Sequence, residues 1–232
     1  MNAPTSERAV ILASGGLDST VTAAVARRGG YVLHLLTIAY QQRHAIEVER
    51  SRQIATALGA HQHVVINVDL RTIGGSALTD EISVPKQRTE SERNQEVPVT
   101  YVPGRNLIFL SLAAAYAEAV EASILYFGAN VIDYAGYPDC RPGFIKAVET
   151  ALHEGTKAGM QGKGIEIRTP LLRMTKAEII RLGLTLNVPF RLTHSCYDPT
   201  GPIACGQCDS CLIRKRGFAE AGVVDPIQYA VC

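Results

Sequence analysis

Six consecutive residues near the N-terminus have the types and order that suit the binding of a phosphate chain. They lie between an apolar run and a segment of helical character, and they are Ser14, Gly15, Gly16, Leu17, Asp18 and Ser19. Two adjacent glycines let backbone N–H groups approach an anion closely, and the positive end of the following helix adds to the attraction. The serines supply hydroxyl donors, and the aspartate can orient the loop or hold Mg²⁺ indirectly. The string predicts a phosphate-binding turn, with an ordinary glycine turn as the alternative.

This turn differs from the two most familiar nucleotide-binding loops. The pattern G-x-x-x-x-G-K-[ST] occurs nowhere in the chain, which excludes a Walker loop. The turn also lacks the third glycine of G-x-G-x-x-G, so dinucleotide binding is a weak interpretation.

Four of the six cysteines lie close together and suit a metal ion. Their spacing is C-x8-C-x2-C-x2-C, and they are Cys196, Cys205, Cys208 and Cys211. Four thiolates complete a closed tetrahedral shell around Zn²⁺, at a Zn–S distance of about 2.3 Å, and a closed shell is structural. Gly206 permits the tight turn between ligands. We predict one structural Zn²⁺ per chain, with an iron–sulfur cluster or a redox dithiol as alternatives. Cys140 and Cys232 receive no role.

Alternating apolar runs and helical segments indicate the elements that must position these groups. Strands are expected at residues 8–13, 31–40, 63–69, 124–127 and 165–169. Helices are expected at residues 19–28, 45–58, 105–120, 142–154 and 175–182. Thr175 and Glu178 form a capping box at the start of the last helix. The alternation predicts an α/β fold with a Rossmann-like, doubly wound parallel sheet.

Three segments lack such a pattern. Residues 70–103 are expected to be a lid or a disordered loop, and residues 155–164, with four glycines, a flexible loop. The chain from about Pro189 onward is turn-rich, and we expect metal binding rather than apolar burial to order it. We therefore expect a nucleotide-binding domain at residues 1–188. A C-terminal zinc-binding segment, residues 189–232, would pack on the same domain.

The composition limits the classes of function. Of the 232 residues, 47% are hydrophobic and 19% charged, which predicts one well-packed domain rather than disorder. A net charge of +1 lacks the electrostatic signature of a nucleic-acid binder. No run approaches the roughly 20 apolar residues that span a bilayer, and the polar start does not resemble a secretory signal. A cytoplasmic location without a membrane partner is the expectation.

The phosphate-binding turn resembles the PP-loop of the N-type ATP pyrophosphatases, which have an adenine nucleotide alpha hydrolase-like fold. These enzymes cleave ATP between its α- and β-phosphates and transfer AMP to a carboxylate, amide or ureido oxygen. Residues 169–176 resemble the segment that brings a basic side chain to the phosphates in that superfamily. The resemblance implies that residues 14–19 bind ATP. It also implies that Asp18, Lys176 and Arg173 act in catalysis, Lys176 before Arg173. A solvated helix lysine is the alternative for Lys176.

Further strings resemble the 7-cyano-7-deazaguanine synthases of queuosine biosynthesis over residues 8–218. They lie at residues 40–47, 102–106, 133–142, 194–197, 205–211 and 216–218. The resemblance implies conversion of 7-carboxy-7-deazaguanine and ammonia to 7-cyano-7-deazaguanine (preQ0), with two ATP consumed and Mg²⁺ accompanying ATP. The implied route adenylates the carboxylate, forms the amide with ammonia, adenylates the amide oxygen and loses AMP to leave the nitrile.

The same resemblance implies a set of substrate-binding residues. They are His44, Arg105, Asn106, Asp133, Tyr134 and Asp139. A carboxylate can accept hydrogen bonds from the N1–H and the exocyclic amine of a guanine-like ring, and Tyr134 or Tyr137 could stack on it. Alternatively, the two aspartates cap their loop and the two tyrosines belong to the core.

Rival functions remain open at this stage. A tRNA-thiolating PP-loop enzyme could use Cys140 as its sulfur carrier, although the neutral charge balance argues against RNA. An amidotransferase that forms NAD or GMP would need free ammonia, because no glutaminase domain is present. A non-catalytic, zinc-stabilised module would bind ATP without releasing pyrophosphate. The oligomeric state is open, and a homodimer is compatible with the sequence.

Overall fold

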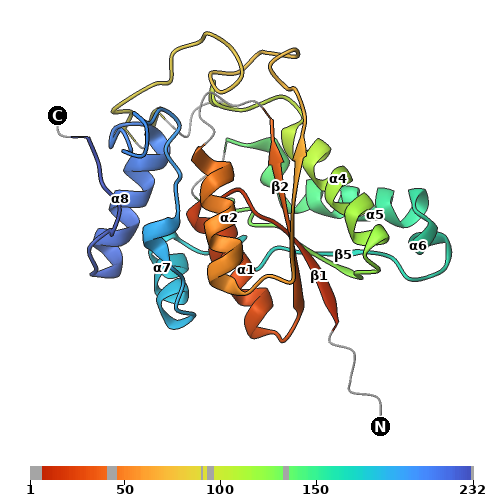
Figure 1. Ribbon diagram of the computed structural model, residues 1–232. Helices are drawn as coiled ribbons and strands as arrows, with labels where there is room; N and C mark the ends of the chain where they lie inside the picture. Colours follow the sequence, from red (N-terminus) through yellow and green to blue (C-terminus); the bar gives the residue numbers. More distant parts are fainter. Residues whose placement is uncertain (1–6, 41–45, 90, 93–96, 133–135, 231–232) are drawn as a thin grey trace.

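Five parallel strands form the centre of the computed structural model, which describes residues 7–40, 46–89, 91–92, 97–132 and 136–230 (Figure 1). The strands are β1 (Arg8–Leu12), β2 (Val32–Ala39), β3 (Gln62–Asn67), β4 (Ile124–Tyr126) and β5 (Glu166–Arg168), in the order β3-β2-β1-β4-β5. All neighbouring pairs are parallel. The predicted doubly wound parallel sheet is confirmed, with strand ends within three residues of the expected positions.

Helices cover both faces of the sheet. On one face lie α1 (Leu17–Arg28), α2 (Ile46–Leu58) and α7 (Lys176–Thr185), and on the other α4 (Arg105–Ala119) and α5 (Pro142–Gly155). Successive side chains of a strand point to opposite faces, so Ala9 and Ile11 join the first apolar cluster while Val10 and Leu12 join the second. Within the described ranges, no helix is both long and apolar enough to cross a membrane.

The order of the strands creates a crevice at the carboxyl ends of the central strands. From β1 the chain builds outward through β2 to β3, and it then returns to the other side of β1 to form β4 and β5. The connections after β1 and β4 therefore leave in opposite directions. Open α/β sheets bind their ligands at this reversal, outside the carboxyl ends of the strands.

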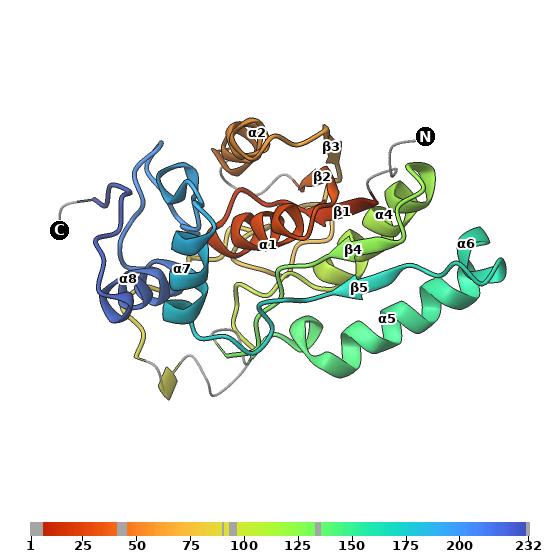
Figure 2. The ribbon, with the colours of Figure 1, turned by 90° about the horizontal axis from the view of Figure 1, so that it is seen from below.

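The expectation of a turn-rich C-terminal segment is wrong in part. After η2 (Phe190–Leu192), the chain forms α8 (Asp209–Ala221), which lies beside α7 at the end of the molecule opposite α5 (Figure 2). Phe218 is 2% exposed, and its ring centroid lies 5.4 Å from that of Phe190 in the main core. The pattern of α8 is weak because its charged residues interrupt any apolar stripe, and packing against α7 supplies the stability instead.

The flexible loop expected at residues 155–164 also contains a helix. It is α6 (Lys157–Met160), and the Thr156 hydroxyl caps it by accepting the Gly159 N–H at 3.0 Å. The four glycines predicted a flexible loop, but they also permit a single helical turn that is capped by Thr156 and lies next to α5. A further short helix, η1 (Pro138–Cys140), precedes α5.

The described part of residues 70–103 packs on the cysteine-bearing segment. Val84 and Ala77 join the same apolar cluster as the four cysteines. The Gln87 N–H donates to the Gln207 carbonyl at 2.8 Å, and Arg88 forms an ion pair with Asp209. These contacts tie residues 77–88 to the start of α8.

Candidate functional site

A cavity of about 240 Å³ opens at the carboxyl ends of β1, β2 and β4. One end is lined by Lys176, by Ser195 and by all residues except Gly15 of the turn at residues 14–19, which we call the phosphate turn. The other end is aromatic and carries one arginine; its side chains include Tyr40, Phe109, Tyr137, Tyr197 and Arg105. The cavity therefore joins an anion-binding end to an end suited to a flat ring.

The phosphate turn is shaped by a close approach that only glycine allows. Gly15 has φ of +81°, and a Cβ atom there would lie 2.4 Å from the Glu47 carbonyl oxygen of α2. The Ser14 hydroxyl oxygen accepts the Gly16 N–H at 3.2 Å and lies 3.1 Å from the Ser19 hydroxyl. Gly16 is the N-cap of α1 and has no side chain to cap the helix. The first N–H groups of α1 therefore have to find partners elsewhere, as an anion-binding helix start requires.

Lys176 is buried and points at the phosphate turn. Its ammonium donates to both carboxylate oxygens of Asp18, at 2.7 and 2.8 Å, and the residue is only 5% exposed. The alternative of a solvated lysine is therefore wrong. A Cβ at Gly217 would lie 2.4 Å from the Lys176 Cγ, so the glycine of α8 makes room for the lysine stem. Arg173 is exposed and does not line the cavity.

Two local features place Lys176 at the first position of α7. The predicted capping box is present, with the Thr175 hydroxyl and the Glu178 carboxylate satisfying each other's backbone N–H groups. Asn130, in the loop that follows β4, donates from its amide to the carbonyls of Leu171 and Met174, at 2.9 and 2.6 Å. The turn before α7 is thereby attached to the edge of the sheet.

Arg105 and Tyr40 define the aromatic end. Arg105 starts α4 after Gly104, whose φ is +65°, and its guanidinium carbon lies 5.9 Å from the centroid of the Tyr40 ring. Burial raises the pKa of Tyr40 to about 12, so the phenol is neutral at pH 7. The Tyr137 hydroxyl lies 2.7 Å from the Thr100 hydroxyl. A cation among neutral aromatic rings suits an electron-rich planar ligand that carries negative charge.

Asp139 lies behind this end of the cavity rather than in its lining. One carboxylate oxygen accepts the Asn106 backbone N–H at 3.2 Å, which caps α4, and the Asn106 amide donates to the Asp139 carbonyl at 3.2 Å. The other oxygen, Oδ1, is buried and has no partner among the described residues. Burial raises the pKa of Asp139. Binding of substrate by Asp139 stays a prediction, which the unsatisfied oxygen supports and the capping contact weakens.

Cys140 is a neutral thiol at the same place. Burial raises its pKa to about 12, and the Asn106 amide nitrogen lies 3.6 Å from its sulfur. Since the thiolate is the nucleophile in sulfur chemistry, this environment disfavours Cys140 as a sulfur carrier.

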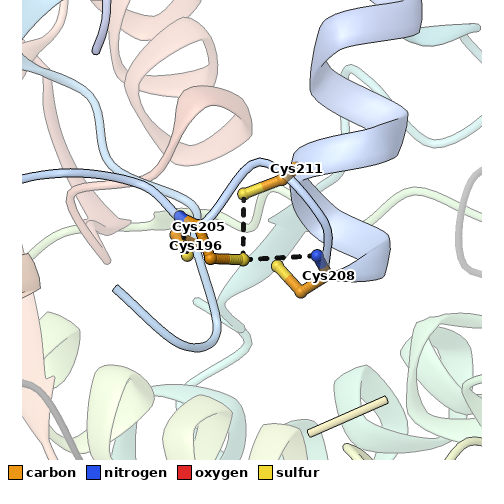
Figure 3. A group of neighbouring side chains, drawn as sticks. All are labelled: Cys196, Cys205, Cys208 and Cys211. Atoms are coloured by element: carbon orange, nitrogen blue, oxygen red, sulfur yellow. Dashed lines mark hydrogen bonds between the residues drawn. The ribbon is translucent and has the colours of Figure 1, made fainter. Parts of the chain in front are cut away.

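The four cysteines form a compact group that can hold a metal ion (Figure 3). All are buried, and their sulfur atoms lie within 4.8 Å of one another, with Cys205 and Cys211 at 4.0 Å. A tetrahedral shell with Zn–S bonds of about 2.3 Å requires sulfur–sulfur distances of about 3.8 Å. Gly206 has φ of +74°, as the tight turn between ligands requires. We call Cys196, Cys205, Cys208 and Cys211 the cysteine cluster.

Backbone N–H groups surround the sulfur atoms of the cluster. Asp198 and Cys205 donate to the Cys196 sulfur, at 3.3 and 3.2 Å. Gln207 and Cys208 donate to the Cys205 sulfur, at 3.4 and 3.3 Å. Such contacts stabilise negative charge on metal-bound thiolates and orient the ligands. The donor set therefore fits a cation held by thiolates.

Not every predicted site residue can be placed. His44, Asp133 and Tyr134 lie outside the described residues. Arg105, Asn106 and Lys176 line the cavity, and their roles stay predictions. Sequence reasoning missed several lining residues, namely Tyr40, Glu47, Asn130, Ser195 and Arg214. Asn130 follows a predicted strand, and Tyr40, Glu47 and Ser195 belong to the strings noted above, but no pattern indicated Arg214.

Comparisons with known proteins agree with this geometry. The model of the family "Queuosine biosynthesis protein QueC" matches residues 8–222. The chain is 55% identical over 224 residues to the 7-cyano-7-deazaguanine synthase of Anaeromyxobacter sp. (strain Fw109-5), covering 96% of each chain. It is 52% identical over 231 residues to the protein of the same name from Desulfatibacillum aliphaticivorans, covering 99% of each.

A solved structure supports the fold alone. The NMN synthetase from Francisella tularensis is similar with a TM-score of 0.51 and 17% sequence identity, covering 95% of this chain and 79% of that one.

Proposed function

This chain belongs to the queuosine biosynthesis protein QueC family, and from that premise we propose that it converts 7-carboxy-7-deazaguanine, ammonia and ATP to 7-cyano-7-deazaguanine. The observation that carries the proposal is the single cavity that joins the phosphate turn and Lys176 to an aromatic end containing Arg105. Such a cavity can hold a nucleotide's phosphates against a planar heterocycle. The family's role in queuosine biosynthesis favours this reaction over the rival thiolation and non-catalytic functions.

The first half of the proposed reaction makes an amide. The substrate carboxylate attacks the α-phosphorus of ATP, and pyrophosphate leaves with the electrons of the broken P–O bond. Ammonia then attacks the acyl adenylate, loses a proton and displaces AMP. The phosphate turn and the Lys176 ammonium would stabilise the charge that develops on the pyrophosphate, which is the main task of the protein in such a transfer.

The second half makes the nitrile at the same site. The amide oxygen attacks the α-phosphorus of a second ATP, and pyrophosphate leaves again. Breaking the C–O bond then expels AMP, and loss of the remaining N–H protons leaves the C≡N triple bond. One site suffices because the reacting oxygen of the amide occupies the place of a carboxylate oxygen.

The aromatic end would hold the deazaguanine. Tyr137 would lie against the ring, and Arg105 with Asn106 would contact its polar groups. Asp139 would offer its unsatisfied Oδ1 to a donor of the base. His44, Asp133 and Tyr134 remain proposed contacts on sequence grounds. In catalysis we place Lys176 and Asp18 at the phosphates, and Arg173 is the weaker candidate because it is exposed.

Two cations belong to the proposal. The cysteine cluster would hold one Zn²⁺. Four thiolates would fill its coordination shell, so the ion would stabilise the structure and leave no coordination position open. Mg²⁺ would enter with ATP and neutralise its phosphates. In this division residues 1–188 form the nucleotide-binding domain, and residues 189–232 form the metal-binding segment. The buried Phe190 and Phe218 support packing of that segment on the domain.

A product inventory tests the proposal. The purified chain, incubated with 7-carboxy-7-deazaguanine, ammonia, Mg²⁺ and ATP, should form the nitrile with about two AMP and two pyrophosphate per turnover, as the family resemblance implies. Finding only ADP and phosphate would contradict adenylation. RNA-dependent pyrophosphate release without nitrile would favour the thiolating alternative.

A further inference from the structure

The start of α1 has a partner from the far end of the chain. The Leu17 N–H, at the first position of the helix, donates to the Ser195 hydroxyl oxygen at 3.4 Å. Ser195 is half-buried and lines the cavity next to Gly16. A Cβ built on Gly16 would lie 3.7 Å from the Ser195 oxygen. The hydroxyl therefore lies where a ligand oxygen would meet an N–H group at the start of this helix.

The backbone of Ser195 is fixed on both sides. On one side, the His194 N–H donates to the Gly15 carbonyl at 2.9 Å, which attaches this segment to the phosphate turn. On the other side, Cys196 belongs to the cysteine cluster and accepts the Asp198 and Cys205 N–H groups. Only rotation about the side-chain bond is left to the hydroxyl, and this rotation decides whether it accepts or donates.

A serine hydroxyl can change roles when a ligand arrives. It is one donor and an acceptor with two lone pairs. At 3.4 Å its bond to the Leu17 N–H is long, and a phosphate oxygen would be a stronger acceptor for that N–H. The released hydroxyl could then donate its own proton to the phosphate. Both groups would stabilise the charge on the leaving pyrophosphate.

We infer that Ser195 is a phosphate-binding residue, contributed to the phosphate turn by the cysteine-bearing segment, and that the metal-loaded cluster positions it. This inference rests on the proposed function for its use in catalysis. It gives the cluster a task in the active site beyond stabilising the fold. Because Ser195 and Cys196 are adjacent, a displacement of the cysteine would displace the hydroxyl.

The test compares three variants of the full, metal-loaded chain. Ser195→Ala removes the hydroxyl, Ser195→Thr keeps it, and Thr200→Ala removes an exposed hydroxyl from the same segment outside the cavity. The probe is inorganic pyrophosphate with Mg²⁺, with binding measured by calorimetry. We expect Ser195→Ala to weaken binding by about 10- to 100-fold, as loss of a hydrogen bond to a charged group does. Ser195→Thr and Thr200→Ala should stay within about 3-fold of the unaltered chain.

Further readouts separate a ligand from a merely structural residue. Metal content and thermal stability of Ser195→Ala should equal those of the unaltered chain, the turnover number should fall, and the KM for 7-carboxy-7-deazaguanine should stay unchanged. Loss of metal in Ser195→Ala would overturn the inference by making the residue part of the cluster's support. Unchanged pyrophosphate affinity would overturn it as well.

A double-variant cycle tests the positioning role of the cluster. Cys208→Ser should weaken pyrophosphate binding about as much as Ser195→Ala, and the two changes together should weaken it no further. Additive losses would show that the cluster and Ser195 act independently and would overturn the second half of the inference.

The binding assay needs no knowledge of the reaction, so the two proposals fail separately. Pyrophosphate binding that depends on Ser195, without nitrile formation, would overturn the proposed function and support Ser195. Nitrile formation with an unaffected Ser195→Ala variant would do the opposite. Absence of pyrophosphate binding by the unaltered chain would overturn the inference on Ser195, while the product inventory would still decide the proposed function.

Discussion

The phosphate turn and the cysteine cluster meet at Ser195, but different forces hold them. The turn continues from β1, whose residues pair with β2 on one side and β4 on the other. Ala9, Val10 and Ile11 of that strand are fully buried between the two helical layers. The turn is therefore anchored by a sheet and by apolar burial, which do not depend on a ligand.

The cysteine cluster has little support from strand pairing or from apolar burial. The buried part of its apolar group consists of the four cysteines with Ala77, Val84 and Ala204. Small side chains bury little area, and burial stabilises by only about 25 cal/mol per Å². Apart from isolated bridges, such as that between Lys86 and Cys208, no strand pairing holds the described part of this region. In our proposal, bonds to a metal ion would supply much of its order.

Helix α8 connects the cysteine cluster with the apolar core. It begins beside the cluster, where Cys211 is its third residue, and it ends in the sheet core with Phe218. Arg214, 2% exposed, bonds to the Asp225 carboxylate at 2.8 and 2.9 Å midway along the helix. Proximity in the chain thus does not decide which force orders a residue. The following predictions separate the two regions, from the largest expected effect to the smallest.

Removal of the metal should give the largest effect and should spare the sheet. Structural zinc in small modules contributes roughly 10 kcal/mol or more at neutral pH. A chelator, or Cys208→Ser, should therefore expose the amides of residues 196–211 to fast hydrogen exchange while β1 and α1 stay protected. Metal analysis and exchange mass spectrometry measure both effects. Cys140→Ser, a buried cysteine outside the cluster, is the control and should keep one metal per chain. Uniform exchange across the sheet would show that the comparison is mistaken.

Breaking the ion pair between Lys176 and Asp18 should reduce both activity and stability. Loss of a charge-stabilising group at the phosphates typically costs about 100-fold or more in rate. Asp18→Asn alone also removes the negative charge that faces the buried Lys176 ammonium, at a cost of about 3–5 kcal/mol. The double variant Asp18→Asn with Lys176→Met should regain stability in urea unfolding but remain inactive in pyrophosphate release. A single variant with normal turnover would remove the pair from the phosphate site.

Gly15→Ala should damage the turn through its close approach to α2. The added Cβ would lie 2.4 Å from the Glu47 carbonyl oxygen, and overpacking of this kind costs about 1–3 kcal/mol. Gly30→Ala is the matched control, since Gly30 has a similar φ of +83° but nothing within 4 Å of its Cβ position. It should cost only the backbone strain, about 1–2 kcal/mol. Urea unfolding gives the loss of unfolding free energy in each variant, and the difference between the two losses is the steric part. Equal losses would contradict the close approach.

The smallest expected effect concerns how the stability of the sheet depends on pH. Burial lowers the pKa of His34 in β2 below the ordinary value of 6.5. The unfolded chain therefore binds a proton more readily, and stability is lost as the pH falls below 6.5 toward the folded-state pKa. His34→Leu should flatten this part of the profile, measured by urea unfolding between pH 7 and 5 in metal-free protein. The metal-free condition matters because acid also releases metal from thiolates. A variant with the same acid dependence would assign it to another group.

The sequence alone determined the features that depend on neighbouring residues. Short continuous apolar runs predicted the strands, because a strand buried on both faces can be recognised from its own residues. The capping box at Thr175 and Glu178 and the turn at Gly206 follow from local backbone chemistry, and both are present. The spacing of the four cysteines likewise predicted their convergence.

Tertiary structure alone decided the contacts between distant segments. Lys176 and Asp18 are 158 positions apart, and Ser195 and Leu17 are 178 apart. The pairing of the first two depends on the packing of α7 on α8 at Gly217, and α8 itself has too weak a pattern to be predicted. Local patterns reflect the conformational preferences of a few residues. Which side chains share a cavity depends instead on how whole helices pack at the edge of the sheet, and no short string contains that information.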